Sequence, residues 1–325
     1  MLVTEDFMLA SSDPGIEIHV RNRRPAGLTR FEPGNIVLFV HGATTSPEAG
    51  FDLKLDGISW MEWMASRGND VYFVSVRTYG RSTRPSAMEQ PPMKNPPLAR
   101  LPDATSDVGT AVDFILKRRK VEKISLLGHS WGTTIMAAYT ATNNAKVHRL
   151  ALFAPQWLRT SGRSLTDAGG DLGAYRLITW ADVKQRRETG LPPGKQEELM
   201  PPPWFEAYME AQFASDPQSG NHDPRAFRAS NGVVQDGRDY LNVGRPMYDP
   251  RDIRVPTLLI IGELDADTPL YMAQAIFPLL VNAPTKKFVI IGDATHVLLT
   301  EKNRMQLFRE VGLFFDEGRA VAAKK

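Results

Sequence analysis

The amino-acid sequence predicts an α/β fold in which helices cover both faces of a mostly parallel central sheet. Short, continuously apolar runs recur along the 325 residues, as in strands that are buried on both faces. Amphipathic patterns of helical length separate most of these runs. This alternation is typical of parallel strands joined by crossover helices, and the chain is long enough to bury such a sheet.

Seven segments are predicted to form the strands of this sheet. Residues 15–22 (GIEIHVRN) alternate apolar and polar side chains, so one face of this strand is expected to be exposed. The other six segments are apolar almost throughout, which predicts burial on both faces. They are residues 35–42, 70–77, 123–129, 149–155, 257–263 and 287–293.

Five segments have the pattern of helices that cover a sheet. One is centred on Trp60, and three begin near Asp103, Trp131 and Pro269. The fifth, residues 301–318, closes the chain. All but the last lie between two predicted strands, which is the position of a crossover helix in a parallel sheet.

The alternation of strands and helices is interrupted between residues 156 and 248. We find no clear buried strand there, and only residues 204–214 have the pattern of an amphipathic helix. The strand pattern resumes at Val255, which predicts a core of residues 1–155 and 249–325 with residues 156–248 inserted. The inserted segment carries aromatic side chains that we expect to be half-exposed: Trp157, Trp180, Trp204, Phe205, Tyr208, Phe213 and Phe227.

The composition excludes several classes of function. The net charge is only +2, and the basic run at residues 117–120 is best explained as the end of a helix, so nucleic-acid binding is not expected. The absence of cysteine excludes disulfides and thiolate catalysis. No apolar run approaches the roughly 18 residues of a membrane span, and the expected location is the cytoplasm.

Ser130 is the strongest candidate for a nucleophile. It lies between Gly128 and Gly132, directly after a predicted buried strand and before a predicted helix. A sharp strand-to-helix turn strains the backbone of its central residue and crowds the positions two residues away, which favours glycine there. The N-terminus of the following helix directs free N–H groups toward the same space, where they would favour a developing negative charge.

A serine hydroxyl needs a base, and His296 is the best candidate among six histidines. It follows the last predicted strand on a short loop, which places it at the same edge of the sheet as Ser130. A carboxylate must orient the imidazole, and Asp265 is our choice, with Asp267 as its rival. His129 is expected to be structural. The chain order of Ser130, Asp265 and His296 is that of hydrolases built on an α/β sheet.

Two backbone N–H groups are predicted to form an oxyanion hole. One belongs to Trp131, and the other comes from the loop after residues 39–42, most simply from Ala43. His41 ends the strand before this loop and is expected to orient the loop by hydrogen bonds. Trp131 is also the aromatic residue that we most expect to contact a substrate.

These segments resemble the α/β-hydrolase superfamily of serine hydrolases over almost the whole chain. The segments HGATTS, GHSWG, GELDADTP and GDATH are similar to its oxyanion loop, nucleophile turn, acid loop and histidine loop. Residues 66–85 resemble a family segment in which an acid is common at Ser75 and glycine at Thr78. The resemblance implies that residues 156–248 form a lid over a largely apolar pocket. His41, Trp157 and Trp204 are our candidates for substrate contacts.

The leading functional hypothesis is hydrolysis of a small apolar carboxylic ester or lactone through an acyl-enzyme intermediate. This chemistry requires neither a metal nor an organic cofactor, and no residue spacing indicates a metal site. Two alternatives use the same three side chains: acyl transfer, and amide hydrolysis of the prolyl aminopeptidase type. The peptidase would need carboxylates in the lid, for which the sequence offers Glu197, Glu198, Glu206 and Glu210. A non-catalytic receptor for a small ligand is the alternative from another class.

Overall fold

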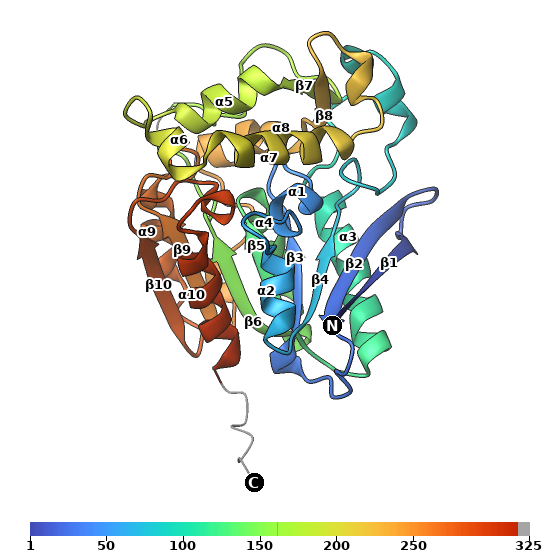
Figure 1. The fold of residues 1–325 in the computed structure, drawn as a ribbon, viewed down its shortest axis with the longest axis vertical. Coiled ribbons are helices and arrows are strands. Elements are labelled where there is room, and N and C mark those ends of the chain that lie inside the picture. The colour runs from blue at the N-terminus through green and yellow to red at the C-terminus, as the bar shows by residue number, and fades with distance from the viewer. Residues whose placement is uncertain (161, 318–325) are drawn as a thin grey trace.

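The computed structural model describes residues 1–160 and 162–317, and within them eight strands form one twisted sheet (Figure 1). The strand order is β1-β2-β4-β3-β5-β6-β9-β10. β2 pairs antiparallel with both β1 and β4, and all other neighbours pair parallel. The strands are Leu2–Ala10 (β1), Glu17–Pro25 (β2), Ile36–Val40 (β3), Asp70–Val74 (β4), Ile124–His129 (β5), Val147–Phe153 (β6), Thr257–Gly262 (β9) and Lys286–Ile291 (β10).

Helices cover both faces of this sheet, as the sequence predicts. α3, α4 and α9 bury their apolar sides in one core cluster, and α2 and α10 bury theirs in another. On the second face the rings of Trp60 and Phe308 stack with their centroids 4.9 Å apart. The helices of this part of the chain are Pro47–Phe51 (α1), Trp60–Ser66 (α2), Leu101–Arg119 (α3), Trp131–Asn143 (α4), Leu270–Leu279 (α9) and Arg304–Asp316 (α10).

Strand β3 shows why the central strands are continuously apolar. Its residues Ile36, Leu38 and Val40 pack in the cluster with α3 and α4. The alternate residues, Val37 and Phe39, pack in the cluster with α2 and α10. Because successive side chains point to opposite faces, a strand covered on both sides favours an apolar residue at every position. This confirms the predicted α/β fold class.

Two parts of the fold differ from the sequence-based expectation. β1 was not expected, because its sequence LVTEDFMLA places Thr4, Glu5 and Asp6 in succession and shows neither a continuous apolar run nor a regular alternation. Residues 156–248 do contain a buried strand, Ala226–Ser230 (β8), which pairs antiparallel with Tyr175–Thr179 (β7). The sequence did not indicate β8 as a buried strand because the strand includes the charged residue Arg228. This side chain is buried in an ion pair with Asp216, and its Nη2 lies 2.6 Å from the Asp216 Oδ1.

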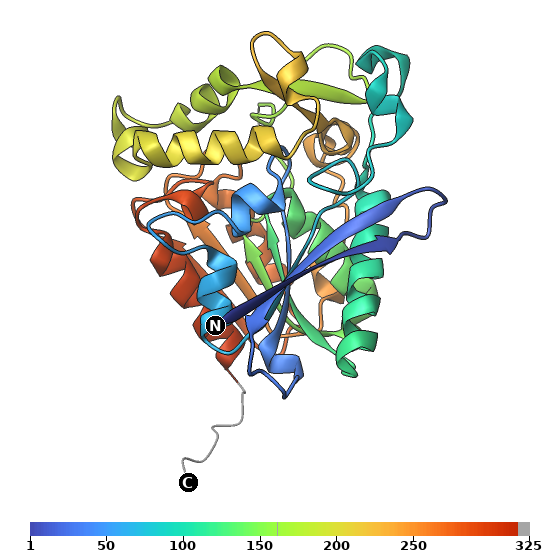
Figure 2. The same cartoon turned by 45° about the vertical axis from the view of Figure 1, so that its right-hand side comes forward.

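Residues 156–248 lie over the carboxyl ends of the parallel strands, at the top of the molecule in Figures 1 and 2. Gln212 of this segment joins it to the loop after β3: its Oε1 accepts from the Ser46 N–H at 2.9 Å, and its Nε2 donates to the Thr44 carbonyl at 3.2 Å. The helices of the segment are Trp180–Glu188 (α5), Lys195–Leu199 (α6), Pro202–Ala214 (α7) and Gly232–Asp239 (α8).

None of the described helices combines the length and the apolar character that crossing a membrane requires.

Thr78 adopts a φ of 76°, the left-handed conformation that favours glycine, at the position where the family resemblance predicts glycine. The backbone at this position therefore keeps the expected conformation although the side chain is different.

The first turn of α4 packs directly against the backbone of β3. A Cβ atom on Gly132 would lie 2.6 Å from the Val40 carbonyl oxygen and 2.7 Å from that of His41. A Cβ on Gly128 would collide with the Gly132 carbonyl group. These contacts involve backbone atoms that have no side-chain freedom, so both positions require glycine.

We predict that Gly132→Ala destabilises the protein by about 1–3 kcal/mol, because the added methyl group overpacks a backbone contact. Gly237→Ala in α8 is a matched control, since its Cβ would enter open space. Alanine in a helix should stabilise the protein there by about 0.5–1 kcal/mol. Urea unfolding measures both variants, and equal stability of the two would contradict the packing account.

Candidate active site

Ser130 occupies a strained turn at the carboxyl end of β5. Its φ of 55° and ψ of −122° lie outside the usual regions for a residue with a side chain. The turn is held by backbone bonds on both sides: the Ser130 N–H donates to the Phe153 carbonyl at 2.9 Å, and the Thr133 N–H donates to the Ser130 carbonyl at 2.8 Å. Strain that the surroundings enforce in this way is frequent at functional sites.

The loop after β3 lies against this turn because Gly42 has no side chain. A Cβ on Gly42 would lie 2.8 Å from the Ser130 Cβ and 3.2 Å from the His129 carbonyl oxygen. Ala43 and Thr44 follow directly and line the same cavity as Ser130. The absence of a side chain at Gly42 thus brings the predicted oxyanion loop and the candidate nucleophile together.

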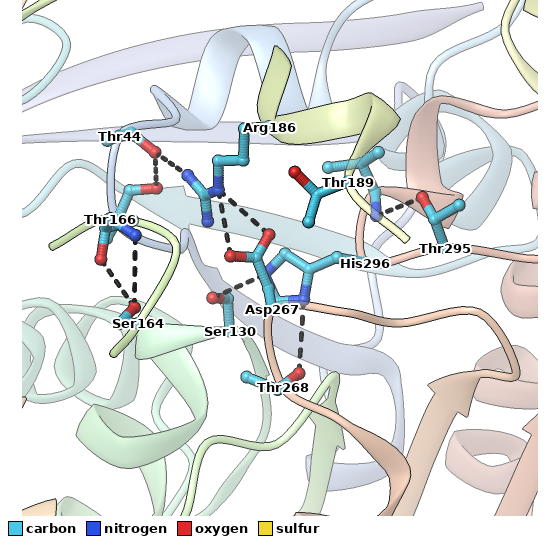
Figure 3. Close-up of polar contacts among 12 residues, drawn as sticks. Thr44, Ser130, Ser164, Thr166, Arg186, Thr189, Asp267, Thr268, Thr295 and His296 are labelled. Atoms are coloured by element: carbon cyan, nitrogen blue, oxygen red, sulfur yellow. Dashed lines mark hydrogen bonds and ion pairs between the residues drawn. The ribbon is translucent and has the colours of Figure 1, made fainter. Parts of the chain in front are cut away.

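Ser130, His296 and Asp265 form one chain of hydrogen bonds. The Ser130 Oγ lies 2.8 Å from the His296 Nε2. The His296 Nδ1 lies 3.0 and 2.9 Å from the two carboxylate oxygens of Asp265. A carboxylate only accepts, so Nδ1 carries the proton and Nε2 is free to accept the serine hydroxyl proton. Figure 3 shows the contact between Ser130 and His296.

Asp265 and Asp267 have different partners. Asp265 accepts the backbone N–H groups of Asp267 and Thr268 at 3.0 and 2.8 Å, and the Thr268 hydroxyl at 2.9 Å. Asp267 instead accepts from the Arg186 Nε, at 3.1 and 3.0 Å to its two oxygens (Figure 3). The structure thus places Asp265, and not its rival, within hydrogen-bonding distance of the imidazole.

The surroundings of His296 raise the pKa of its imidazole. Burial alone opposes the charged form, but the carboxylates of Asp265 and Asp267 outweigh it, so the pKa lies above its ordinary value. Arg186 lowers the pKa of Asp267 against the opposing effect of burial. The Asp267 carboxylate therefore stays ionised beside an imidazole that accepts a proton readily.

His129 and His41 have structural contacts. The His129 Nε2 lies 3.0 Å from the His296 carbonyl oxygen, and burial followed by the proximity of His296 holds its pKa well below the usual value. The Val76 N–H donates to the His41 Nε2 at 3.2 Å, and the His41 Nδ1 therefore donates to the Gly42 carbonyl at 2.8 Å. Burial lowers the pKa of His41 to about 4, so the ring is uncharged at neutral pH. It connects the loop after β3 to the residue Val76, which follows β4.

A cavity of about 240 Å³ opens beside Ser130 and His296, between the core and residues 156–248. Its wall is largely apolar and includes Leu165, Leu177, Ile178, Val183, Leu264 and Val297. The aromatic residues proposed for substrate contact do not line it. Trp131 is buried beside His41 and Tyr79, Trp157 packs on Tyr248, and Trp204 lies against the Arg304 guanidinium.

Three arginines that sequence reasoning missed line this cavity: Arg176, Arg186 and Arg187. The glutamates that a peptidase would need do not line it, and Glu198 and Glu210 are paired with Lys195 and Arg225 instead. No motif marked the arginines, because their positions depend on how residues 156–248 fold back over the core. Thr268 was also missed, although its place three residues after Asp265 suits a hydroxyl that bonds back to a carboxylate.

A family model described as the alpha/beta hydrolase family matches residues 37–310. No curated protein matches the chain. Many solved structures match it. The three described below have low sequence identity to it. A membrane phospholipase A described as a bacterial virulence factor shares 18% identity with a TM-score of 0.63, over 97% of this chain and 86% of its own.

Two further structures are similar over nearly their full lengths. The CarC serine hydrolase of carbazole degradation has 14% identity and a TM-score of 0.64, over 97% of this chain and 99% of its own. A thermophilic esterase from Thermogutta terrifontis has 17% identity and a TM-score of 0.59, over 94% of this chain and 96% of its own. At such identities the likeness shows the fold alone. The family model, however, spans most of the sequence, and the chain belongs to the alpha/beta hydrolase family.

Proposed function

We propose that this hydrolase cleaves carboxylic esters or lactones through an acyl-enzyme intermediate formed on Ser130. The observation that carries the proposal is the 2.8 Å contact between the Ser130 Oγ and the His296 Nε2, with Asp265 on the far side of the ring. A nucleophile, a base and an orienting acid in this order, at the wall of a cavity that can hold a substrate, are what acyl transfer to serine requires.

In the first step the Ser130 oxygen attacks the ester carbonyl carbon while the His296 Nε2 takes the hydroxyl proton. The resulting imidazolium is stabilised by the Asp265 carboxylate, which its other bonds to Thr268 hold in place. His296 then gives the proton to the leaving alcohol, and the acyl group stays on Ser130. In the second step His296 removes a proton from water, which attacks the acyl-enzyme. His296 then gives that proton to the Ser130 Oγ as its bond to the acyl carbon breaks and the acid is released.

The negative charge on the carbonyl oxygen would be held by the N–H groups of Ala43 and Trp131. Trp131 is the first residue of α4, so its N–H has no partner within the helix, and the helix dipole favours negative charge at this end. Among the described residues the Ala43 N–H makes no hydrogen bond. Two unpaired donors beside Ser130 support a ready oxyanion hole.

We also propose that residues 156–248 act as a lid over this site. They supply much of the cavity wall opposite Ser130, including Leu177, Ile178 and Tyr208. A cover of this kind excludes water other than the one needed for deacylation and strengthens each electrostatic contact inside. The mainly apolar wall favours the acyl or alcohol chain of an ester over a peptide ammonium group.

Ser130→Ala should lower kcat for 4-nitrophenyl butyrate by about 10⁶-fold, because no other hydroxyl occupies the bond to His296. A fluorophosphonate probe should label the native protein at Ser130 and leave the variant unlabelled, which mass spectrometry of the peptide detects. Thermal unfolding of the variant serves as the control for folding. Native protein that neither reacts with the probe nor cleaves the ester would support the receptor alternative.

The pH dependence of kcat/KM should follow the ionisation of His296. Because its pKa is raised and the neutral ring is the base, activity should fall as the pH drops through that raised value. Asp265→Asn removes the charge that raises the pKa, so the acid limb of the profile should move to lower pH while kcat falls by about 10⁴-fold.

Asp267→Asn is the matched control, because this side chain does not hydrogen-bond the imidazole and bonds Arg186 instead. Its kcat should fall far less than that of the Asp265 variant. A loss of kcat at Asp267 as large as at Asp265 would show that the wrong carboxylate has been assigned to the base.

A further inference from the structure

Arg176 of β7 carries a positive charge in the cavity wall and has no carboxylate partner among the described residues. Its Nη1 donates to the Ser230 carbonyl at 2.7 Å and to the Asn231 Oδ1 at 3.1 Å. Its Nε and Nη2 are closed off from solvent and have no hydrogen-bond partner among the described residues. Leaving charged donors buried and unpaired costs free energy, so such a group is rarely kept without a function.

The two unpaired nitrogens form one edge of the guanidinium. The N–H of Nε and one N–H of Nη2 point in parallel, and this edge matches the two oxygens of a carboxylate in a side-on pair. The opposite edge, which includes Nη1, is already bound to the backbone of β8 and the turn after it. The bonds of Nη1 therefore hold the side chain in place while the carboxylate-binding edge stays vacant.

Two other charged groups of the wall are already hydrogen-bonded. Arg186 bonds the Asp267 carboxylate and the Thr44 hydroxyl. Asp182 accepts from the backbone N–H and the hydroxyl of Thr179 at the start of α5. Arg187 lies over the Tyr208 ring, with its Cζ 4.3 Å from the ring centroid, and it also lacks a carboxylate partner among the described residues. Of the three arginines of the wall, however, Arg176 is the one whose Nε and Nη2 are both buried without a partner, whereas in Arg187 this holds for Nη2 alone.

A short path of contacts connects Arg176 to the proposed oxyanion loop. Arg176 bonds the Ser230 carbonyl, and the Ser230 Oγ lies 3.3 Å from the Tyr79 hydroxyl. The Tyr79 hydroxyl in turn accepts from the Thr44 N–H at 3.4 Å. Arg176 therefore lies on the same side of the cavity as the residue that follows Ala43. Burial lowers the pKa of Arg176 to about 10, so the group remains a cation at neutral pH.

We propose that the substrate carries a carboxylate, separate from the scissile ester, that pairs with the Nε and Nη2 of Arg176. This inference rests on the proposed ester hydrolysis and adds the substrate class: an amphiphilic ester with an apolar chain and one anionic end. A small side-chain shift on binding is enough to bring the vacant edge to the ligand, since rotamer changes at binding sites are common. A single two-donor edge suits a planar monoanion better than a phosphate dianion, which needs more donors and charges.

The test compares esters of equal chain length that differ only in the distal carboxylate. Mono-4-nitrophenyl adipate and 4-nitrophenyl hexanoate form the acyl series. 3-(Butanoyloxy)benzoate and 3-(butanoyloxy)benzamide form the alcohol series. In one of the two series the native enzyme should prefer the carboxylate by about 10- to 100-fold in kcat/KM, as expected for a desolvated, charge-assisted pair.

Arg176→Met should bring that ratio close to one, and Arg176→Lys should restore part of it, because lysine keeps the charge without the two-donor edge. Arg225→Met is the matched control: it removes the same charge from the same segment, but at an exposed ion pair with Glu210. Its ratio should equal that of the native enzyme. A ratio that falls equally in both methionine variants would mean general electrostatics and would overturn the assignment.

A measurement on the native protein keeps the test independent of how the variants fold. Adipate should inhibit the cleavage of 4-nitrophenyl hexanoate at least tenfold more strongly than hexanoate does. Cleavage of the neutral esters with no preference for a carboxylate in either series, and equal inhibition, would overturn this inference and leave the proposed function intact. Failure to cleave any of the four esters would count against the proposed function and against this inference with it.

Discussion

The contact between the first turn of α4 and the backbone of β3 sets the geometry on which the site depends. Gly132 lies against the carbonyl groups of Val40 and His41, which draws the start of α4 toward the neighbouring strand. The chain must therefore turn sharply at Ser130, and this residue takes the strained φ of 55°. Gly42, in the loop after β3, lies so close to this turn that a Cβ atom there would be 2.8 Å from the Ser130 Cβ. Gly132 and Gly42, together with Gly128 behind the turn, thus decide where one hydroxyl group lies.

The sheet could be predicted from the sequence because its signal is local. A strand such as β3, with alternate residues in two different cores, must be apolar at every position, and a continuous apolar run is visible without knowledge of the fold. The candidate residues Ser130, Asp265 and His296 could be predicted for the same reason: each lies on the short segment that follows one of these runs. Parallel strands bring their carboxyl ends to one edge of the sheet, so these three residues lie close together in the fold.

The cavity wall could not be predicted because its contacts are not local. Arg186 and Arg176 lie on α5 and β7, and each bonds to groups that are distant in sequence. Trp157 and Trp204 were predicted to contact the substrate because they belong to the inserted segment. Both pack on other side chains outside the cavity: Trp157 is buried against Tyr248, and the partly exposed ring of Trp204 lies against the Arg304 guanidinium.

Arg186 connects three parts of the molecule at the site. It belongs to the segment proposed as a lid, and it bonds the Thr44 hydroxyl of the oxyanion loop and the Asp267 carboxylate of the acid loop (Figure 3). If this segment swung outward, the Asp267 carboxylate would lose its counter-charge and the field on the neighbouring imidazole would change. Under the proposed function, a movement of this segment would therefore alter the basicity of His296 through a single guanidinium, because the Arg186 charge opposes protonation of the imidazole and also lowers the pKa of Asp267.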